Sequence, residues 1–531
     1  MAKNQLWRTK PLSLLLEEAA GENRLRRVLG PVQLSALGVG AIIGTGIFVL
    51  TGVAAHDKTG PALMLSFVAS GLACIFAALC YAEFASMVPV AGSAYTYAYA
   101  TLGELFAWII GWDLVLEYTV GSSTVAHGWS HYFQDFISIL GIKFPPLLAN
   151  APFDFVNGEF VSTGALFDLP AVIITCIVTY ILVKGIRESA SVNAGVVILK
   201  LAVVLFVIVV GAFHVNPENW KPFAPFGFGG ISFFGQTLWG QTDAGGAPVG
   251  MLAGAAIIFF AYIGFDSVST HAEEAKNPQR DVPIGIISSL VICTLLYIVV
   301  SAILTGMVRY DQIDINAPVS AAFAQVGLPW AQFIISLGAL AGITSVLLVM
   351  MLSQPRVMLA MARDGLVSPK FFGAIHEKFR TPWKSTILTG FFVALLAALL
   401  PLRILAELVN IGTLLAFVIV CAAVLIMRRI HPEAVRPFRV PFYPLTPILG
   451  IITCMILMFS LPLENWVRLA VWLGAGFVIY FAYGKKHSVM SHHTEGAIAH
   501  QGISGYGGDL DPKVDPRDEP PGGPKPPAGS R

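Results

Sequence analysis

Long apolar runs, separated by short charged or glycine- and proline-rich segments, dominate the chain. Each run is close to the ~20 residues that an α-helix needs to cross a bilayer, whereas a transmembrane strand needs only ~10 residues and alternates apolar with polar positions. The pattern therefore predicts an all-α, polytopic membrane protein with twelve transmembrane helices. The predicted spans cover residues 33–55, 62–87, 98–127, 169–184, 189–212, 251–272, 284–308, 330–355, 384–400, 405–427, 446–462 and 467–483.

Composition agrees with this class. Hydrophobic residues make up 56% of the 531 positions, charged residues make up 12%, and the mean hydropathy is +0.72. These values exclude an ordinary soluble globular protein. We therefore expect a lipid bilayer and a small molecule as partners, and no nucleic acid. The cysteines all lie in predicted spans without the spacing of metal ligands, so no metal site is expected.

The 33 Lys and Arg residues are distributed unevenly over the predicted loops. Lys200 lies inside a span, six residues lie in loops on one side of the membrane, and the others lie on the opposite side. Because basic residues concentrate in cytoplasmic loops, both termini are predicted to be cytoplasmic. The membrane is predicted to be a plasma membrane, and more specifically a bacterial inner membrane. The six residues of the poorer side are Lys58, Lys143, Lys221, Arg309, Arg403 and Arg468.

Three regions follow from these patterns. Residues 1–30 are charged and lack the short apolar core of a cleavable signal peptide, so they are predicted to form a cytoplasmic N-terminal segment. Residues 31–483 hold the twelve spans. Residues 484–531 are rich in Gly, Pro, His and charge, and they are predicted to be a disordered cytoplasmic tail.

The first span is interrupted near its middle by the sequence Gly44-Thr45-Gly46. In hydrocarbon every backbone N–H and C=O group needs a partner, so a helix weakened at its midpoint is tolerated only beside protein or a polar cavity. The span is therefore a candidate binding site. The alternative is a helix-packing face formed by Gly40 and Gly44.

A second interruption lies in the sixth span, at Tyr262-Ile263-Gly264-Phe265-Asp266. Two broken spans five helices apart suggest a duplication, and because five is odd the two copies must cross the membrane in opposite senses. We predict inverted repeats over residues 33–212 and 251–427, with extra helices at 446–483. Paired broken helices in such repeats are typical of secondary transporters, whose site lies near the midplane.

The chemistry of a helix break indicates the type of ligand. Where the outer half of the first span begins, at Gly44, Thr45 and Gly46, unpaired amides and the positive end of the helix dipole favour a carboxylate. Carbonyl groups at the ends of the preceding half-helices favour an ammonium. An α-amino acid carries both groups. The predicted amine-binding carbonyls belong to Ile42, Ile43, Tyr262 and Ile263.

Several motifs together resemble the amino acid–polyamine–organocation superfamily, and specifically its cationic amino acid transporter branch. They are residues 40–48, residues 259–269 with their continuation through 273–285, residues 116–126, and residues 355–365. The resemblance covers about residues 28–483. It implies a LeuT-like fold with discontinuous first and sixth helices, and an amino acid permease rather than an enzyme.

Lys200 lies about eleven residues into the fifth span, which at 1.5 Å per residue places it near the midplane. A charge at that depth is costly, so a functional role is the default, and burial favours gain and loss of a proton. The alternative is a side chain that extends to the membrane surface. The resemblance implies that the ammonium replaces a sodium ion of related carriers, and hence a sodium-independent, proton-linked cycle.

The third span carries two carboxylates, Asp113 and Glu117, on one helix face. Two ionised groups at this spacing repel each other in a low dielectric, so one is expected to be protonated or paired. The resemblance favours Glu117 as the proton-coupling group beside Lys200. Asp113 is either its structural partner or a partly solvated residue.

The substrate side-chain pocket is predicted to include Gly264, Phe265, Asp266 and Thr344. Asp266 either meets the substrate or caps the helix that begins at Ser267. Thr344 either faces the substrate or packs between helices.

These predictions describe a permease that moves an α-amino acid by alternating access, coupled to a proton gradient and without a bound cofactor. The alternatives are an exchanger of amino acids or polyamines, and a sensor that binds without transport. Cationic and small neutral amino acids both remain open as substrates.

Overall fold

The computed structural model describes residues 5–11, 29–88, 92–156, 159–185, 190–233 and 236–492. Most of the predicted N-terminal segment, at residues 12–28, and most of the predicted tail, at residues 493–531, lie outside the described residues. The longer helices are α2 (Pro31–Ile42), α4 (Leu63–Met87), α5 (Ser93–Thr101), α6 (Glu104–Ile139), α7 (Leu169–Lys184), α8 (Ala190–Ala212), α9 (Met251–Ile258), α11 (Pro278–Met307), α12 (Pro318–Gln325), α13 (Pro329–Arg363), α15 (Trp383–Leu399), α16 (Leu402–Ile430), α17 (Leu445–Phe459) and α18 (Leu463–Ile479).

Short elements complete the chain. They are the helices α3 (Thr51–Ala54), α10 (Ser267–Thr270), α14 (Pro369–Phe372), α19 (Lys485–His487) and α20 (Val489–His492), and three antiparallel strand pairs, β1 (Phe153–Val156) with β2 (Glu159–Ser162), β3 (Ile231–Phe233) with β4 (Gln236–Trp239), and β5 (Gln241–Thr242) with β6 (Pro248–Val249).

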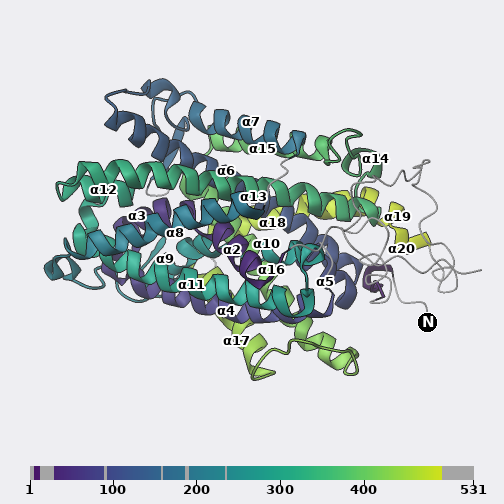
Figure 1. The fold of residues 1–531 in the computed structure, drawn as a ribbon. Coiled ribbons are helices and arrows are strands. Elements are labelled where there is room, and N and C mark those ends of the chain that lie inside the picture. Colours follow the sequence, from purple (N-terminus) through teal and green to yellow (C-terminus); the bar gives the residue numbers. More distant parts are fainter. Residues whose placement is uncertain are drawn as a thin grey trace, which may run out of the picture. The chain divides into compact units, whose positions relative to one another are not determined.

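Helix occupies part or all of every predicted span. Within the described residues, seven helical stretches are long and apolar enough to cross a membrane, and four shorter apolar helices accompany them. The chain is therefore a helical, multi-pass membrane protein. Figure 1 shows its long helices side by side, and among them α13 packs along α6 while α11 packs along α4 and α2.

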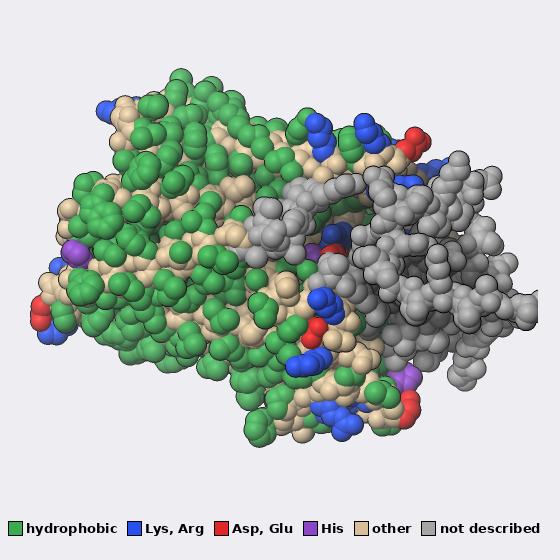
Figure 2. All heavy atoms as spheres, in the orientation of Figure 1, with side chains coloured by type: hydrophobic (Ala, Val, Ile, Leu, Met, Phe, Trp, Pro, Cys, Tyr) green, Lys and Arg blue, Asp and Glu red, His purple; other side chains and the backbone are tan. Residues whose placement is uncertain are grey.

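The helices contact one another through small residues. A Cβ atom added to Gly111 of α6 would lie 2.8 Å from the sulfur of Met361 in α13, and one added to Gly338 would lie 2.3 Å from Val203 of α8. Such close approach is how helices gain packing energy in a membrane. The outward surface is apolar, with Leu295 and Phe391 about 60% exposed, and Figure 2 shows hydrophobic side chains covering most of the visible face.

The bundle has two ends, which we name by their residues. The hairpin face comprises residues 56–60, 140–168, 213–250 and 308–328, and it carries the strand pairs. The terminal face comprises residues 5–11, 92–103, 364–382, 431–444 and 485–492. In Figure 1, α3 and α12 lie toward the first face, whereas α5, α14, α19 and α20 lie toward the second.

The terminal face is held by a network that ties both described ends of the chain to the helices. The ammonium of Lys10 lies 3.0 Å from Oδ1 of Asp364, whose Oδ2 accepts a 2.6 Å hydrogen bond from Tyr95. The carboxylate of Glu104 accepts hydrogen bonds from Tyr480 and Ser488. Residues 485–490, at the start of the predicted tail, are helical or in contact with the helices here, a feature of which their composition gave no sign.

Candidate functional site

Both predicted interruptions are breaks in helical structure. The helix α2 ends at Ile42, Ile43 takes an extended conformation (φ −72°, ψ 104°), and a wide helical turn begins at Gly46. In the sixth span, Ile263 is extended (φ −59°, ψ 133°) and Gly264 has φ 120° before α10 begins at Ser267. The backbone is therefore non-helical at two places that are buried inside the protein.

The two broken spans lie against each other and run in opposite directions. A Cβ atom added to Gly264 would lie 2.9 Å from the carbonyl oxygen of Ala41, and one added to Gly46 would lie 2.3 Å from Cα of Ala261. Toward the hairpin face, the N–H of Gly250 donates to the carbonyl of Lys58. In these three pairs the residue number in the sixth span falls as the residue number in the first span rises. The two spans are therefore antiparallel, and they cross at their breaks.

Lys200 occupies the end of the α2 half-helix. Its side chain is fully buried, and its ammonium donates to the carbonyl oxygens of Gly40 and Ile43. Gly342 of α13 leaves room for the stem, because a Cβ atom there would lie 3.3 Å from Cγ of Lys200. The alternative of a side chain that extends to the membrane surface is therefore wrong. The positive charge instead stabilises carbonyls that the helix break leaves without intrahelical partners.

Two of the four predicted amine-binding carbonyls already accept hydrogen bonds from the protein. The carbonyl of Ile43 accepts from Lys200, and that of Ile42 accepts a 2.9 Å bond from the hydroxyl of Tyr297. A carbonyl oxygen has two lone pairs, so a second donor remains compatible with this geometry. On the sixth span, the ring of Tyr262 is anchored elsewhere, since its hydroxyl donates to Phe67. Amine binding by Ile42, Ile43, Tyr262 and Ile263 stays a prediction.

The predicted carboxylate cradle contains a buried hydroxyl without a partner. Oγ1 of Thr45 makes no hydrogen bond among the described residues, and the residue is 1% exposed. Its methyl group packs on α6, because a Cβ atom at Gly128 would lie 2.4 Å from Cγ2 of Thr45. Buried hydroxyl groups are normally hydrogen-bonded, so this one is suited to receive a polar ligand.

Asp266 is tied to the break and to α6. Its Oδ1 accepts from the N–H of Gly264 at 3.2 Å, and its Oδ2 accepts from the hydroxyl of Tyr118 at 2.9 Å. It stands at the N-cap position of α10 but makes no side-chain capping bond there. The predicted capping role is therefore wrong in this conformation. The carboxylate instead shapes the turn that separates the two halves of the sixth span.

Asp113 and Glu117 both lie inside the bundle on α6. Each is at most 2% exposed, and each has one carboxylate oxygen without a hydrogen-bond partner among the described residues, Oδ1 and Oε1 respectively. Gly412 of α16 closes over Asp113, since a Cβ atom there would lie 2.5 Å from Oδ1. An unpaired ionised carboxylate in such a place would be very costly. The geometry therefore suits groups that hold a proton for at least part of the time.

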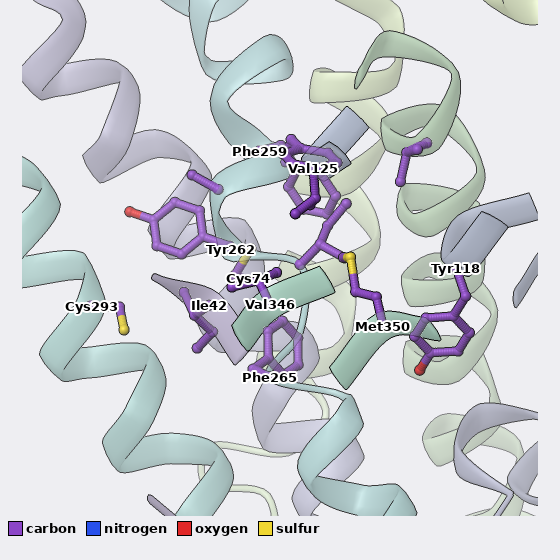
Figure 3. Packing of buried hydrophobic residues seen from close by; sticks show 14 of the residues in the cluster. Ile42, Cys74, Tyr118, Val125, Phe259, Tyr262, Phe265, Cys293, Val346 and Met350 are labelled. Carbon is purple, nitrogen blue, oxygen red and sulfur yellow. The ribbon is translucent and has the colours of Figure 1, made fainter. Parts of the chain in front are cut away.

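The surroundings of Phe265, a residue of the predicted side-chain pocket, are mostly apolar. Figure 3 shows Ile42, Phe265, Val346 and Met350 in one buried cluster around the breaks. The ring of Phe265 packs on Tyr81 and Phe417. Thr344, which precedes Val346 on α13, accepts a 2.9 Å hydrogen bond from the indole of Trp129 and donates to Leu340, so its hydroxyl is satisfied by the protein.

Comparison with known proteins decides the family. Residues 29–481 match the model of the family described as amino acid permease. The chain belongs to the amino acid permease family. It is thus a permease of the amino acid–polyamine–organocation superfamily that resembles the cationic amino acid transporters, and not an enzyme.

Relatives of this permease carry different substrate names. It is 49% identical to the branched-chain amino acid permease BcaP of Bacillus subtilis and 44% identical to the methylthioribose transporter of the same species, in each case over 92% of this chain and all of the relative. It is 40% identical to the vacuolar cationic amino acid transporter 4 of Arabidopsis thaliana, over 81% of this chain and 68% of the relative. The bacterial relatives fit a plasma membrane location.

Sequence reasoning missed several contributors to the site of this permease. Tyr297 and Tyr118 support the two breaks, and Trp129 binds Thr344. Each is an aromatic residue with one polar atom inside an apolar span, which is the only signal that the sequence offers for it.

Proposed function

We propose that this chain is a secondary active permease that moves a neutral α-amino acid with an apolar side chain across the plasma membrane. The observation that carries the proposal is the antiparallel crossing of two broken spans, where Lys200 closes one half-helix and Thr45 presents an unpartnered hydroxyl. Paired broken helices at a midplane site are the arrangement in which transporters bind small charged groups through the backbone.

The antiparallel contacts support the inverted repeat. A repeat of five helices inserted in opposite senses would bring the first and sixth spans together in this way, with twelve spans in total and two of them outside the repeats. The hairpin face would then be extracytoplasmic and the terminal face cytoplasmic. Figure 2 supports this orientation, because Lys and Arg side chains gather toward the terminal face in that view.

The neighbourhood of the breaks supports a neutral substrate. Phe265, Val346 and Met350 line the buried cluster, and the one nearby acid on the sixth span, Asp266, is already engaged by Gly264 and Tyr118. A cationic side chain would need an ionised carboxylate free to pair with it, and the unpaired carboxyl group of Glu117 is proposed to hold the coupled proton instead. The name of one relative described above, a branched-chain amino acid permease, agrees with an apolar side chain.

Coupling is proposed to use protons and not sodium. The ammonium of Lys200 lies on two carbonyls at the end of α2, where a bound cation would otherwise be needed. Glu117 supplies a buried carboxyl group that can hold a proton while the site rearranges. No cofactor is needed beyond the proton gradient, and alternating access would come from rocking of one helix set against the other.

Uptake of labelled leucine into proteoliposomes tests the proposal. We expect accumulation driven by an inward proton gradient, unchanged when sodium is replaced by potassium, and inhibited by valine and isoleucine more than by lysine. Binding without accumulation would identify a sensor. Uptake that requires amino acid inside the vesicles would identify an exchanger.

The second relative favours one other candidate, a carrier of methylthioribose. That compound lacks the ammonium and carboxylate for which the breaks are suited. Competition between leucine and methylthioribose separates the two candidates. If valine inhibits leucine uptake and methylthioribose does not, the amino acid is supported. If the vesicles take up methylthioribose saturably but do not take up leucine, the amino acid is contradicted.

A further inference from the structure

A polar cavity lies at the hairpin face, away from the helix breaks. Its volume is about 420 Å³, enough for an amino acid and a few waters, and it lies between the end of α6, the segment 143–150 and the segment 314–317. The only large apolar side chain in its lining is Phe144. Such a lining suits a small polar or charged molecule better than a lipid chain.

The walls carry charges of both signs. Asp135 and Asp314 line the cavity, and so does Lys143, which is solvent-exposed. Oδ1 of Asp314 accepts hydrogen bonds from the backbone N–H groups of Asn316 and Ala317, and these bonds fix the direction of the carboxylate. A zwitterion presents an ammonium and a carboxylate together, so it is complementary to a cavity with acids and an amine in its walls.

One further wall residue has an unused polar atom. The ring of His131 bonds Asn150 through Nε2 at 3.1 Å, whereas its Nδ1 is buried and has no partner among the described residues. Both residues line the cavity. That nitrogen is closed off from the cavity, so His131 contributes to the wall through its bond to Asn150 and not through a free ligand contact.

The cavity wall also touches the outer half of the first span. A Cβ atom added to Gly52 of α3 would lie 2.6 Å from the carbonyl oxygen of Asp314. The opposite wall is fixed, because Asp135 accepts hydrogen bonds from Ser320, Gln332 and Ser336 of α12 and α13. A molecule in the cavity would thus bridge α6 to the segment that contacts the outer half of the first span.

We propose that this cavity is an outer docking site at which the substrate amino acid binds before it reaches the helix breaks. The ammonium binds at Asp314, and the carboxylate binds near Lys143. The proposal rests on the proposed function, since it takes the same amino acid as its ligand.

Protection of an engineered cysteine tests the site in proteoliposomes with L-leucine as the probe. Ser138→Cys places a thiol in the cavity wall, and Ser162→Cys places one on β2 of the same face but outside the cavity. Both are made in a Cys176→Ala background, because Cys176 is the exposed native thiol of the described residues. We expect leucine to slow labelling of Ser138→Cys by a membrane-impermeant maleimide about fivefold and to leave Ser162→Cys unchanged.

A charge-removing pair separates docking from a distant conformational effect. Asp314→Asn keeps the Oδ1 acceptor of its turn, and Lys143→Gln removes an exposed amine. Together they should abolish protection of Ser138→Cys and raise the KM of uptake, while the maximal rate is retained. Protection that survives both substitutions would overturn the site, and so would equal labelling with and without leucine in vesicles that accumulate leucine.

The two proposals fail differently in this experiment. Vesicles that never accumulate leucine contradict the proposed function, whatever the labelling shows. Vesicles that accumulate leucine without protecting Ser138→Cys contradict the docking site alone.

Discussion

The helix breaks differ from one network of the terminal face, formed by Lys10, Tyr95 and Asp364, in how their buried polar groups are paired. At the terminal face, Lys10, Tyr95 and Asp364 satisfy one another. Around the breaks, the hydroxyl of Thr45 and one carboxylate oxygen of Glu117 have no partners among the described residues. A buried polar group left unsatisfied costs about 1–3 kcal/mol, so a fold keeps such groups only where another requirement outweighs stability. The paired network holds structure, whereas the unpaired groups mark where ligand and proton are expected.

The largest expected effect comes from filling the crossing of the broken spans. A methyl group at Gly46 would meet the backbone of Ala261 at 2.3 Å, whereas one at Gly44 would meet only the side chain of Val346 at 2.7 Å. Backbone cannot move aside as a side-chain end can. We expect Gly46→Ala to reduce leucine uptake about 100-fold and Gly44→Ala to reduce it about tenfold or less.

The control for this pair is Gly474→Ala, because nothing lies within 4 Å of a Cβ atom at that position of α18. It should transport like the unmodified protein. Equal loss for Gly46→Ala and Gly44→Ala, at equal amounts of folded protein in the membrane, would contradict the crossing geometry.

Removing the charge at the end of α2 should have the next largest effect. Lys200→Met leaves the carbonyls of Gly40 and Ile43 without their donor. We expect uptake to fall about tenfold or more and its dependence on external pH to flatten. Lys184→Met, at the exposed end of α7, is the matched control and should change neither. A normal pH profile in Lys200→Met would remove Lys200 from the coupling scheme.

Much of the region around the two helix breaks was predictable from the sequence, because glycines and an acid inside apolar runs are rare and costly. The two breaks and the burial of Lys200 follow from that argument. The hydrogen bonds that Asp266 makes to Gly264 and Tyr118 do not, since they depend on which helices pack together. Local spacing allowed Asp266 either to cap α10 or to meet the substrate, and in this conformation its side chain makes no capping bond but contacts Tyr118.

The terminal face was the least predictable part. Residues 485–492 have the composition of a tail, yet the N–H of Val489 donates to the carbonyl of Asp364 and Ser488 donates to Glu104. These contacts join positions that are 125 and 384 residues apart in the sequence. No local pattern in a single sequence specifies such pairs.

A smaller effect on rate, with a distinctive signature, is expected at Glu117. Glu117→Gln keeps the shape of a protonated carboxyl group but cannot release the proton. With equal pH inside and outside the vesicles, we expect the rate of leucine exchange to stay within about threefold of that of the unmodified protein. Accumulation of leucine against its gradient should be lost. Asp113→Asn, one turn away on α6, should retain both activities. Loss of accumulation in Asp113→Asn and not in Glu117→Gln would reverse the assignment.

The smallest effect on transport is expected where polar groups are already paired. Lys10→Met leaves Asp364 with Tyr95 alone, and both members of the broken pair are largely buried, with side chains 7% and 13% exposed. Breaking a buried pair of this kind costs roughly 3 kcal/mol, so the purified protein should unfold at a lower temperature while transport changes less than threefold. Lys221→Met breaks the exposed pair with Glu218, whose side chains are 71% exposed, and should not change the unfolding temperature measurably. If Lys10→Met instead abolished transport without lowering the unfolding temperature, the terminal network would belong to the transport cycle, and the contrast between paired structure and unpaired function would not hold.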